Sequence, residues 1–337
     1  MTQIDCAVPR SDAPPYFDAT MYDVSVLVVN YNTADLLEPC IGALRRAAVG
    51  LHLQVIVVDN ASRDDSVAVL RRDFSDCELI VNTENVGFGR ANNQAMALAR
   101  GRFVLLLNTD SFVSPDTLYK TVGYMDANVR CGVLGVRLLC ENGEQQASCR
   151  NFPTLLGSFV ASAGLPRWLP WVRLVDDRDW NPTVTRRCDW VPGCYFLVRR
   201  EVINEVGLFD PRFFMYFEEV DHCRAAQRAG WEVVYFADTT VVHLGGASAN
   251  SQNEMPVSRD RQIVPLQIES ALLYFRKHGG VPGVLAALLG TAASDGVQAL
   301  RSLLLGRSLT EMLAPVLHFA VVWRLFRLTS MGSKPTR

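Results

Sequence analysis

Several common signatures are missing from this sequence of 337 residues. Its nine cysteines include no C-x-x-C pair, so no zinc knuckle is expected, and a dispersed, odd set of thiols favours a reducing compartment over a disulfide framework. The N-terminus has no apolar run of the signal-peptide type. These absences predict a protein that is made and kept on the cytoplasmic side.

Motifs of the common nucleotide-binding and hydrolase folds are also absent. The first predicted strand is followed by N-Y-N-T-A-D instead of G-x-G-x-x-G, which excludes an NAD or FAD fold. Without G-x-x-x-x-G-K-[ST] or G-x-S-x-G, neither a P-loop nor a nucleophile elbow is expected. The 33 basic and 35 acidic residues leave a net charge of -2, so we expect no nucleic-acid partner.

What the sequence does contain is enough apolar material for a large core. Hydrophobic residues make up 49% and charged residues 20%, which excludes disorder of the whole chain. After a Pro-rich leader, strand and helix patterns alternate four times: strands are expected at 24–29, 54–58, 78–81 and 103–107, with helices at 34–48, 64–74 and 90–99 between them. This alternation predicts an α/β fold with a mostly parallel, Rossmann-like sheet between helices.

The second half of the chain is less regular. Helices are expected over 115–127, from about 200 to 207, and from the acidic cluster to 230; strands are expected over 132–138, 194–198, 231–236 and 239–242. No element is predicted between 141 and 190. The chain is therefore divided into a flexible leader (1–22), one α/β domain (23–270) and a C-terminal helical extension (271–337).

Three polar clusters follow predicted parallel strands. They are Asn30 with Asn32, Asp59 with Asn60, and Asn108 with Asp110. Each cluster alone fits a turn or a helix cap equally well. Because open parallel sheets bind ligands beyond the carboxyl ends of their strands, three such clusters together favour a ligand site.

Two further candidates lie later in the chain. Glu218, Glu219 and Asp221 follow the aromatic run F-F-M-Y-F; acids at a helix start also stabilise the helix dipole, and that interpretation stays open. At helical spacing Glu218 and Asp221 share a face and Glu219 points elsewhere, so one acid anchors the turn and another faces the cleft. His243 is either an ordinary surface or core histidine, or it joins Asp110 in a site for Mg²⁺ or Mn²⁺.

An ordered set of segments resembles a known family. The segments are V-S-V-L-V-V-N-Y-N, V-V-D-N-A-S-R-D, N-V-G-F-G-R-A-N-N, L-L-L-N-T-D, W-V-P-G-C-Y-F-L-V-R-R, G-L-F-D-P-R-F-F-M-Y-F-E-E-V-D, R-A-G-W and V-V-H-L-G-G. Across residues 23 to 250 this order is similar to that of the family-2 glycosyltransferases with a GT-A fold, especially the branch of bacterial rhamnosyltransferases.

The resemblance implies roles for individual residues. Asp59 resembles the acid that reads the nucleotide base, Asp110 the last acid of the D-x-D metal motif, Glu219 the catalytic base and His243 a further metal contact. The implied nucleotide site comprises Asn30, Asn32, Asp59, Asn60, Gly87, Asn92 and Asn108. Glu218 and Asp221 stay as alternative catalytic acids.

The sequence departs from the family pattern at two positions. Asn108 replaces the first acid of D-x-D, which implies fewer protein ligands for the metal, and the base position holds Glu where Asp is commoner. Q-x-x-R-W, the mark of processive synthases, is replaced by Gln227-Arg-Ala-Gly-Trp231. A single-addition enzyme is therefore expected.

The expected function is inverting, metal-dependent transfer of a sugar from a nucleotide diphosphate to a saccharide, preferentially a lipid-linked one, in cell-surface polysaccharide synthesis. The branch resemblance favours dTDP-rhamnose as donor, with UDP-hexoses second. A sugar-1-phosphate nucleotidyltransferase is one alternative, but it needs a basic, Gly-rich loop after the first strand, and no Lys or Arg occurs between that strand and Arg45. The other is a non-catalytic sugar-nucleotide-binding partner of an assembly complex, against which the acids at 59, 110 and 219 argue.

The C-terminal segment from Val281 to Leu328 is rich in Leu, Ala and Val. Its uncharged stretches, 281–294 and 312–323, are shorter than the roughly 20 residues that span a membrane, and Asp295, Glu311 and Pro315 are expected to interrupt a longer span. Four arginines and Trp323 with Phe326 predict peripheral attachment to the anionic inner face of the cell membrane. Packing on the domain, or a homo-oligomer contact through these helices, is the alternative.

Overall fold

The computed structural model describes residues 22–176, 180–245 and 260–337. The predicted leader therefore lies outside the described residues except for Tyr22, where the first strand begins. The first four strands are β1 (Tyr22–Asn30), β2 (Leu53–Asp59), β3 (Glu78–Val81) and β4 (Gly101–Asn108). The helices between them are α1 (Ala34–Ala47), α2 (Ser66–Asp73) and α3 (Phe88–Met96). The alternation predicted for this half of the chain is confirmed.

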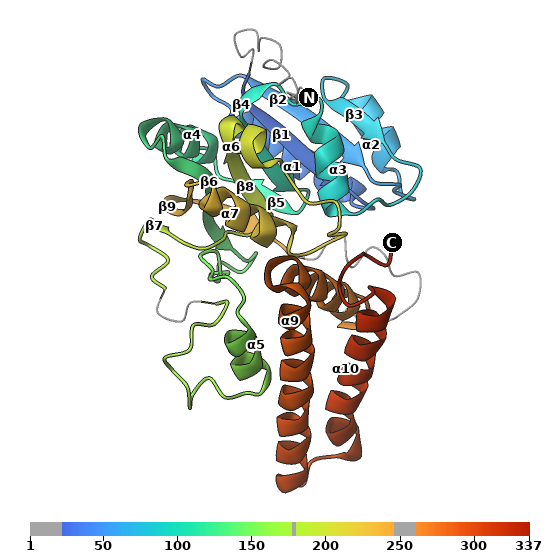
Figure 1. The fold of residues 1–337 in the computed structure, drawn as a ribbon. Helices are drawn as coiled ribbons and strands as arrows, with labels where there is room; N and C mark the ends of the chain where they lie inside the picture. Colours follow the sequence, from blue (N-terminus) through green and yellow to red (C-terminus); the bar gives the residue numbers. More distant parts are fainter. Residues whose placement is uncertain (1–21, 177–179, 246–259) are drawn as a thin grey trace, which may run out of the picture.

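The strands form one mixed sheet of nine strands, in the order β3-β2-β1-β4-β8-β6-β9-β5 with β7 beside β9 (Figure 1). Strands β3, β2, β1 and β4 are parallel, as predicted. The second half adds β5 (Ser111–Val113), β6 (Cys131–Leu139), β7 (Arg186–Arg187), β8 (Tyr195–Arg199) and β9 (Glu232–His243). Of these, β8 runs antiparallel to both of its neighbours, and β5 and β7 run antiparallel to β9.

Helices cover both faces of the sheet. Side chains of α1, α2 and α4 (Thr117–Ala127) share one apolar cluster with Val24, Val26 and Val28 of β1. Side chains of α3, α6 (Arg200–Val206) and α7 (Glu218–Arg228) form the other cluster, with Leu27 of the same strand. Because successive side chains of a strand point to opposite faces, one uninterrupted apolar strand supplies both cores.

The structure differs from the sequence prediction around β9. Two strands are predicted, at 231–236 and 239–242, but β9 is one strand from Glu232 to His243. Its pairing with β6 shifts register between Val136 and Arg137, which pair with Phe236 and Thr240. The intervening residues of β9 bulge out and the strand then resumes, so the polar Asp238 marks a bulge and not a strand end.

The region 141–190, in which no element is predicted, contains one helix and one short strand among its described residues. These are α5 (Leu155–Ser162) and β7. Thr154 caps α5 by accepting a hydrogen bond from the Gly157 N–H. The helix has only eight residues, and it packs on the C-terminal extension, so no local amphipathic pattern marks it.

The C-terminal extension is a helical hairpin that projects away from the α/β domain (Figure 1). Its first arm is α9 (Asp260–Leu304), which breaks at Gly280, where φ is +63°. Its second arm is α10 (Leu309–Leu328). The predicted boundary between residues 270 and 271 lies inside α9, whose first half contributes Leu273 and Tyr274 to the core of the domain.

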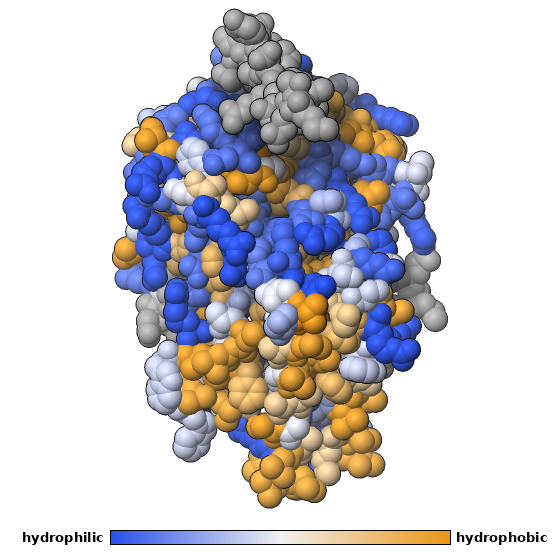
Figure 2. Space-filling view, viewed as in Figure 1, coloured by the Kyte–Doolittle hydropathy of each residue, from blue (hydrophilic) through white to orange (hydrophobic). Residues whose placement is uncertain are grey.

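Asp295, Glu311 and Pro315, which are expected to interrupt a longer span, do not end the helices: Asp295 lies inside α9, and Glu311 and Pro315 lie inside α10. Ser308 and Glu311 form a capping box that starts α10, and Pro315 is accommodated inside it. Two helical stretches, Pro265–Leu304 and Leu309–Leu328, are each long and apolar enough to cross a membrane by length and composition, and only 22% and 17% of their most apolar windows are buried. Figure 2 shows apolar side chains gathered over this part of the molecule.

Candidate active site

A cleft of about 270 Å³ opens beyond the carboxyl ends of β1 and β4, and the N-terminus of α7 forms part of its wall. The parallel register places Asn30 beside Asp59, and Val29 beside Asn108, so the predicted polar clusters do meet at one edge of the sheet. The lining residues are Val29, Tyr31, Asn60, Asn85, Phe88, Asn108, Thr109, Asp110, Pro192, Gly193, Cys194, Met215, Tyr216, Glu218, Glu219 and His243.

Asp110 and His243 face one another in this cleft. Strand β5 pairs with β9 so that Ser111 lies opposite His243, and the His243 Nε2 atom is 3.5 Å from Asp110 Oδ1. The Nδ1–H of His243 donates to Gln146 Oε1 at 2.9 Å. That hydrogen bond fixes the tautomer and leaves the Nε2 lone pair directed at the carboxylate, and burial lowers the pKa of His243, which favours the neutral ring.

Gln146 is a site residue that sequence reasoning missed. Its Nε2–H also donates to the His243 carbonyl at 2.6 Å, so it holds both the ring and the backbone of the histidine. It lies in the region 141–190, and a single glutamine there carries no local signal of this role. Only the folding of that segment against β9 brings the pair together.

The arrangement of Asp110 and His243 fits a divalent cation with few protein ligands. A carboxylate and a neutral imidazole are both accepted by Mn²⁺, and a histidine that donates its other N–H to a second residue is the usual form of a metal ligand. The described residues contain no group of three or more His, Cys, Asp or Glu side chains placed to hold a metal. The remaining positions would have to come from the diphosphate and water.

Glu218 and Glu219 line the same cleft, at the start of α7. One carboxylate oxygen of each, Oε2, is buried and has no hydrogen-bond partner among the described residues. Burial raises the pKa of both carboxyls, and for Glu218 the neighbouring negative charge of Glu219 raises it further. A buried carboxylate with a free lone pair is suited to accept a proton.

The backbone before these acids is held in an uncommon conformation. Tyr216 and Phe217 both have positive φ values, of +71° and +69°. Bulky residues rarely adopt this region, and such strain clusters where surrounding structure fixes a functional side chain. Nearby, a Cβ on Gly87, which has φ +90°, would lie 2.5 Å from the Phe214 carbonyl, so only glycine fits there.

The predicted nucleotide-binding residues divide into two groups. Asn60 and Asn108 line the cleft. Asn30 and Asp59 are fully buried behind it, where the Asn30 Nδ2–H donates to Asp59 Oδ2 at 2.8 Å and the Ser62 N–H donates to Asp59 Oδ1 at 3.0 Å. In the structure one Asp59 oxygen thus binds the end of β1, and the other binds the loop that carries Asn60.

The other members of the predicted nucleotide site also brace loops. Asn32, at φ +52°, accepts a hydrogen bond from the Arg63 N–H at 2.6 Å. Asn92 is buried in α3 and donates to the Phe88 carbonyl at 3.0 Å. Neither lines the cleft, and nor does Gly87.

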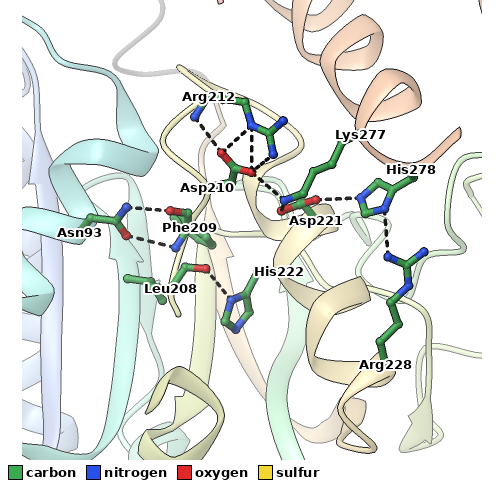
Figure 3. A network of polar contacts seen from close by, with 10 residues as sticks. All are labelled: Asn93, Leu208, Phe209, Asp210, Arg212, Asp221, His222, Arg228, Lys277 and His278. Carbon is green, nitrogen blue, oxygen red and sulfur yellow. Dashed lines mark hydrogen bonds and ion pairs between the residues drawn. The ribbon is translucent and has the colours of Figure 1, made fainter. Parts of the chain in front are cut away.

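Asp221, an alternative catalytic acid, is not among the lining residues of the cleft; its side chain faces Lys277 and His278 (Figure 3). Its carboxylate accepts from Lys277 Nζ at 2.6 Å and from His278 Nε2–H at 2.8 Å, both on α9. Lys277 also binds Asp210. The acid that sequence spacing places on the same face as Glu218 therefore joins two helices.

Thiol chemistry is not expected in the cleft. Cys194 lines it, but burial raises the pKa of this thiol to about 12, which suppresses the thiolate. No disulfide joins the eight cysteines among the described residues.

Comparisons with known proteins agree with this geometry. A family model described as glycosyl transferase family 2 matches residues 25–223. The N-acetylglucosaminyl-diphospho-decaprenol L-rhamnosyltransferase of Mycobacterium tuberculosis is 28% identical over 231 residues, which cover 65% of this chain and 75% of that protein. The rhamnosyltransferase WbbL of Escherichia coli is 24% identical over 234 residues, covering 65% of this chain and 83% of that protein.

Among solved structures, the mannosyltransferase PcManGT from Pyrobaculum calidifontis in complex with GDP-Man and Mn²⁺ has a TM-score of 0.51 and 18% sequence identity. The match covers 92% of this chain and 89% of that one. The predicted fold class, a GT-A sheet between helices with a C-terminal helical extension, is confirmed.

Proposed function

We propose that this chain, which belongs to glycosyl transferase family 2, transfers one sugar from a nucleotide diphosphate to an acceptor hydroxyl with inversion at the anomeric carbon. The family resemblance drawn from the sequence motifs is confirmed by that membership. The single observation that carries the mechanism is that Asp110 and His243 line the same cleft as the acid pair Glu218 and Glu219. The aspartate and histidine suit a diphosphate and its cation, and the acid pair suits a proton acceptor.

Glu219 is the proposed general base. An acceptor hydroxyl gives its proton to a Glu219 carboxylate oxygen while the acceptor oxygen bonds to the anomeric carbon. The bond from that carbon to the phosphate oxygen breaks on the opposite side, and its electron pair leaves with the nucleoside diphosphate. The outcome is inversion, by the geometry of inverting glycosidases with an alcohol in place of water.

Asp110 and His243 are the proposed protein ligands of Mg²⁺ or Mn²⁺. When bound, the cation would supply charge stabilisation to the diphosphate leaving group, whose negative charge grows as the glycosidic bond breaks. Asn108 contributes an uncharged amide where the usual motif has a second acid, so the site depends more on the two ligands that remain. Asn60, Asn108 and the backbone of the 59–63 loop are proposed to bind the nucleotide, with Asp59 acting through that loop.

The donor and acceptor are proposed from the relatives. Two of them are rhamnosyltransferases, so dTDP-rhamnose is the first donor to test, with UDP-hexoses second. The name of the mycobacterial relative includes a diphospho-decaprenol, so a lipid-linked saccharide is the proposed acceptor class. The exposed apolar hairpin supports attachment to the inner face of the cell membrane, where such an acceptor is presented.

A donor screen tests this function. Purified full-length protein is incubated with candidate nucleotide sugars, and released nucleoside diphosphate is measured with and without a saccharide-diphosphate-lipid acceptor. We expect acceptor-dependent release that stops in excess EDTA and returns with Mn²⁺ or Mg²⁺. Full activity in EDTA, or in Asp110→Asn, would contradict the metal role.

The screen also separates the alternatives left open by the sequence. A nucleotidyltransferase would release diphosphate from a nucleoside triphosphate and a sugar phosphate, and a non-catalytic partner would bind nucleotide sugar without any release. The matched control variant is Asp116→Asn, an acid outside the cleft whose carboxylate pairs with Lys120.

A further inference from the structure

A second, basic cleft of about 640 Å³ lies between α5, α7 and α9 and shares no lining residue with the catalytic cleft. Three arginines line it: Arg224 and Arg228 from α7, and Arg173 from the segment that follows α5. Asp189 is the one carboxylate among its lining residues, and it lies 3.7 Å from Arg173. The cleft therefore carries net positive charge.

Arg224 and Arg228 have no carboxylate partner within the described part of the chain. The Arg224 Nη1–H donates to the neutral hydroxyl of Tyr274 at 2.7 Å, and its guanidinium lies over the rings of Phe152 and Tyr274. The Arg228 Nη1–H donates to His278 Nδ1 at 3.3 Å (Figure 3). Because His278 Nε2–H already donates to Asp221, Nδ1 is an acceptor, and both arginines keep their full charge for an anion.

The break in α9 adds backbone donors to the same cleft. Gly279 and Gly283 line it, on either side of the break at Gly280. The second half of α9 thus begins at the cleft wall, where its first free N–H groups and its dipole favour a negative charge. A Cβ on Gly283 would lie 2.8 Å from the Phe275 carbonyl, so glycine permits this close approach.

Two parts of the chain reach from the basic cleft to the catalytic cleft: helix α7, and the paired segments around Arg150 and Trp190. Glu219 lies in the first turn of α7 and the two arginines in its last two turns, which is about 8 to 14 Å further along the helix axis. In the paired segments, Arg150 forms an isolated β-bridge with Trp190. The positive charge of Arg150 lowers the pKa of Glu219, and the next residue, Asn151, lines the basic cleft. A short saccharide attached to a phosphate group matches this separation.

The basic cleft also leads to the apolar hairpin. A narrower groove of about 50 Å³ between α5 and α9 shares Leu155 and Phe275 with it, and Phe159 and several hydroxyl side chains line it further along. In the segment that follows α5, the side chains of Trp168 and Trp171 are 78% and 74% exposed. An anion site that continues into a narrow groove along α9, with exposed tryptophans in the neighbouring segment, suits a lipid diphosphate at a membrane interface.

We propose that the basic cleft formed by Arg173, Arg224, Arg228 and the start of the second half of α9 binds the diphosphate of the lipid-linked acceptor, and that the α5–α9 groove receives the first part of its lipid chain. This assignment rests on the proposed function. It explains why arginines without carboxylate partners lie between the catalytic base and the hairpin. Arg224 and Arg228 are then positioning residues that hold the saccharide near Glu219.

Binding is tested first, because it does not depend on catalysis. Farnesyl diphosphate and farnesol are titrated into the full-length protein by calorimetry, with wild type, the double variant Arg224→Gln/Arg228→Gln and the control Arg71→Gln on the exposed surface of α2. We expect farnesyl diphosphate to bind the wild type and the control with similar affinity, and to bind the double variant at least tenfold more weakly. Farnesol, which lacks the diphosphate, should bind the wild type much more weakly than farnesyl diphosphate does. Equal affinity in all three proteins would overturn the proposal.

Two further measurements distinguish a lipid diphosphate from a membrane headgroup as the bound anion, and distinguish failure of the anion site from failure of the proposed function. Vesicles with phosphatidylglycerol replace farnesyl diphosphate in one arm; if the arginines are needed for vesicle binding but farnesyl diphosphate does not bind, the cleft holds a membrane headgroup and the proposal fails. In the other arm, two acceptors with the same saccharide are compared. The double variant should raise KM for the saccharide-diphosphate-lipid at least tenfold, whereas kcat and KM for the alkyl glycoside, which has no diphosphate, should be unchanged. Absence of any transfer by wild type, together with arginine-dependent diphosphate binding, contradicts the proposed function and not the anion site.

Discussion

The chemistry at the scale of single residues depends on which acids in the first turn of α7 face the cleft. Glu218 and Glu219 do, and Asp221 does not. Replacing Glu219 by Gln keeps the shape and removes the proton acceptor, so kcat should fall by about a hundredfold or more with little change in donor affinity. The check is steady-state kinetics with donor binding by calorimetry, and the control is Glu201→Gln on exposed α6. Normal turnover in Glu219→Gln, with only Glu218→Gln inactive, would move the role to the neighbouring acid.

The raised pKa values of the acid pair predict a pH profile. A base acts only when deprotonated, so kcat/KM should fall as pH drops through a pKa that lies above the ordinary value of a glutamate. The charge of Glu219 raises the pKa of Glu218, so Glu219 loses its proton first, beside a protonated Glu218. Glu218→Gln resembles that protonated neighbour and should leave the acidic limb in place. The profile is measured for both proteins with the same donor. A limb that moves to lower pH in the variant would show that Glu218 is ionised before Glu219.

The same pair predicts how stability depends on pH. A carboxyl whose pKa is higher in the folded state than in the unfolded state favours folding when protonated, and that contribution is lost as pH rises through the folded-state value. Glu218→Gln should therefore raise the melting temperature of the metal-free protein at pH 8 and have little effect near pH 4. Thermal unfolding at the two pH values measures this, and a larger gain at the lower pH would contradict it.

Gln146 is expected to act on the cation through His243. Gln146→Leu removes the acceptor that fixes the imidazole, and loss of such a partner typically lowers metal affinity by about 10- to 100-fold. Mn²⁺ binding in the presence of nucleoside diphosphate is measured by calorimetry. The control is Gln145→Leu, since Gln145 is also hydrogen-bonded but contacts Arg137 instead of the histidine. Equal metal affinity in both variants would remove Gln146 from the site.

At the scale of elements, the contact between α7 and α9 decides how the hairpin is fixed to the catalytic domain. Asp221 joins them through Lys277 and His278, and Tyr274 packs its ring on Phe217. Because the first half of α9 contributes to the domain core and the break at Gly280 follows it, we place the start of the hairpin at that break. The helix that carries the proposed catalytic acids, α7, is thus also the helix on which the hairpin rests.

Asp221→Asn tests this division of roles. Loss of the buried charge should lower the free energy of unfolding by about 1 to 3 kcal/mol, since Lys277 and His278 each lose a charged acceptor. Turnover should stay within a few-fold of wild type at a temperature where both proteins are folded. Denaturant unfolding and kinetics on the same samples give the answer. A stable variant with turnover reduced a hundredfold would assign catalysis to Asp221.

At the scale of the whole molecule, the apolar surface is concentrated on the hairpin (Figure 2). Leu304 at the end of α9 is 77% exposed and Leu317 of α10 is 65% exposed. The double variant Leu304→Asp/Leu317→Asp should therefore reduce flotation of the protein with vesicles of anionic lipid at least tenfold, because two charges oppose burial in the bilayer interface. Donor hydrolysis should be unchanged.

Val49→Asp/Val129→Asp is the matched control, since these valines are 78% and 70% exposed on the α/β domain. Equal flotation of both double variants would contradict the membrane role. If the hairpin variant alone changes from a dimer to a monomer by light scattering, with no flotation of wild type, the apolar surface is a subunit contact. Resistance of bound wild type to alkaline extraction would indicate insertion deeper than the peripheral attachment we propose.

The sequence by itself determined the α/β domain. Its strands are continuous apolar runs of Val, Ile and Leu, and such runs are stable only when buried on both faces of a sheet, so each run predicts its own element and the alternation predicts the layers. Because parallel strands end at the same edge, the polar residues that follow β1, β2 and β4 had to converge there. The identity of the acids at 110 and 219 and of the histidine at 243 was also readable, since their motifs are local.

Only the tertiary structure decided what those residues contact. Helical spacing groups Glu218 with Asp221, but the packing of α7 puts Glu218 and Glu219 in the cleft and Asp221 against Lys277 and His278 of α9. The partner of His243 comes from a segment 97 residues earlier in the chain, and the basic cleft combines Arg224 and Arg228 of α7 with Arg173, about 50 residues earlier in the sequence. A helix or strand can be predicted from local sequence when burial of its own apolar face stabilises it. A site assembled from distant loops cannot, because its geometry depends on the packing that brings those loops together.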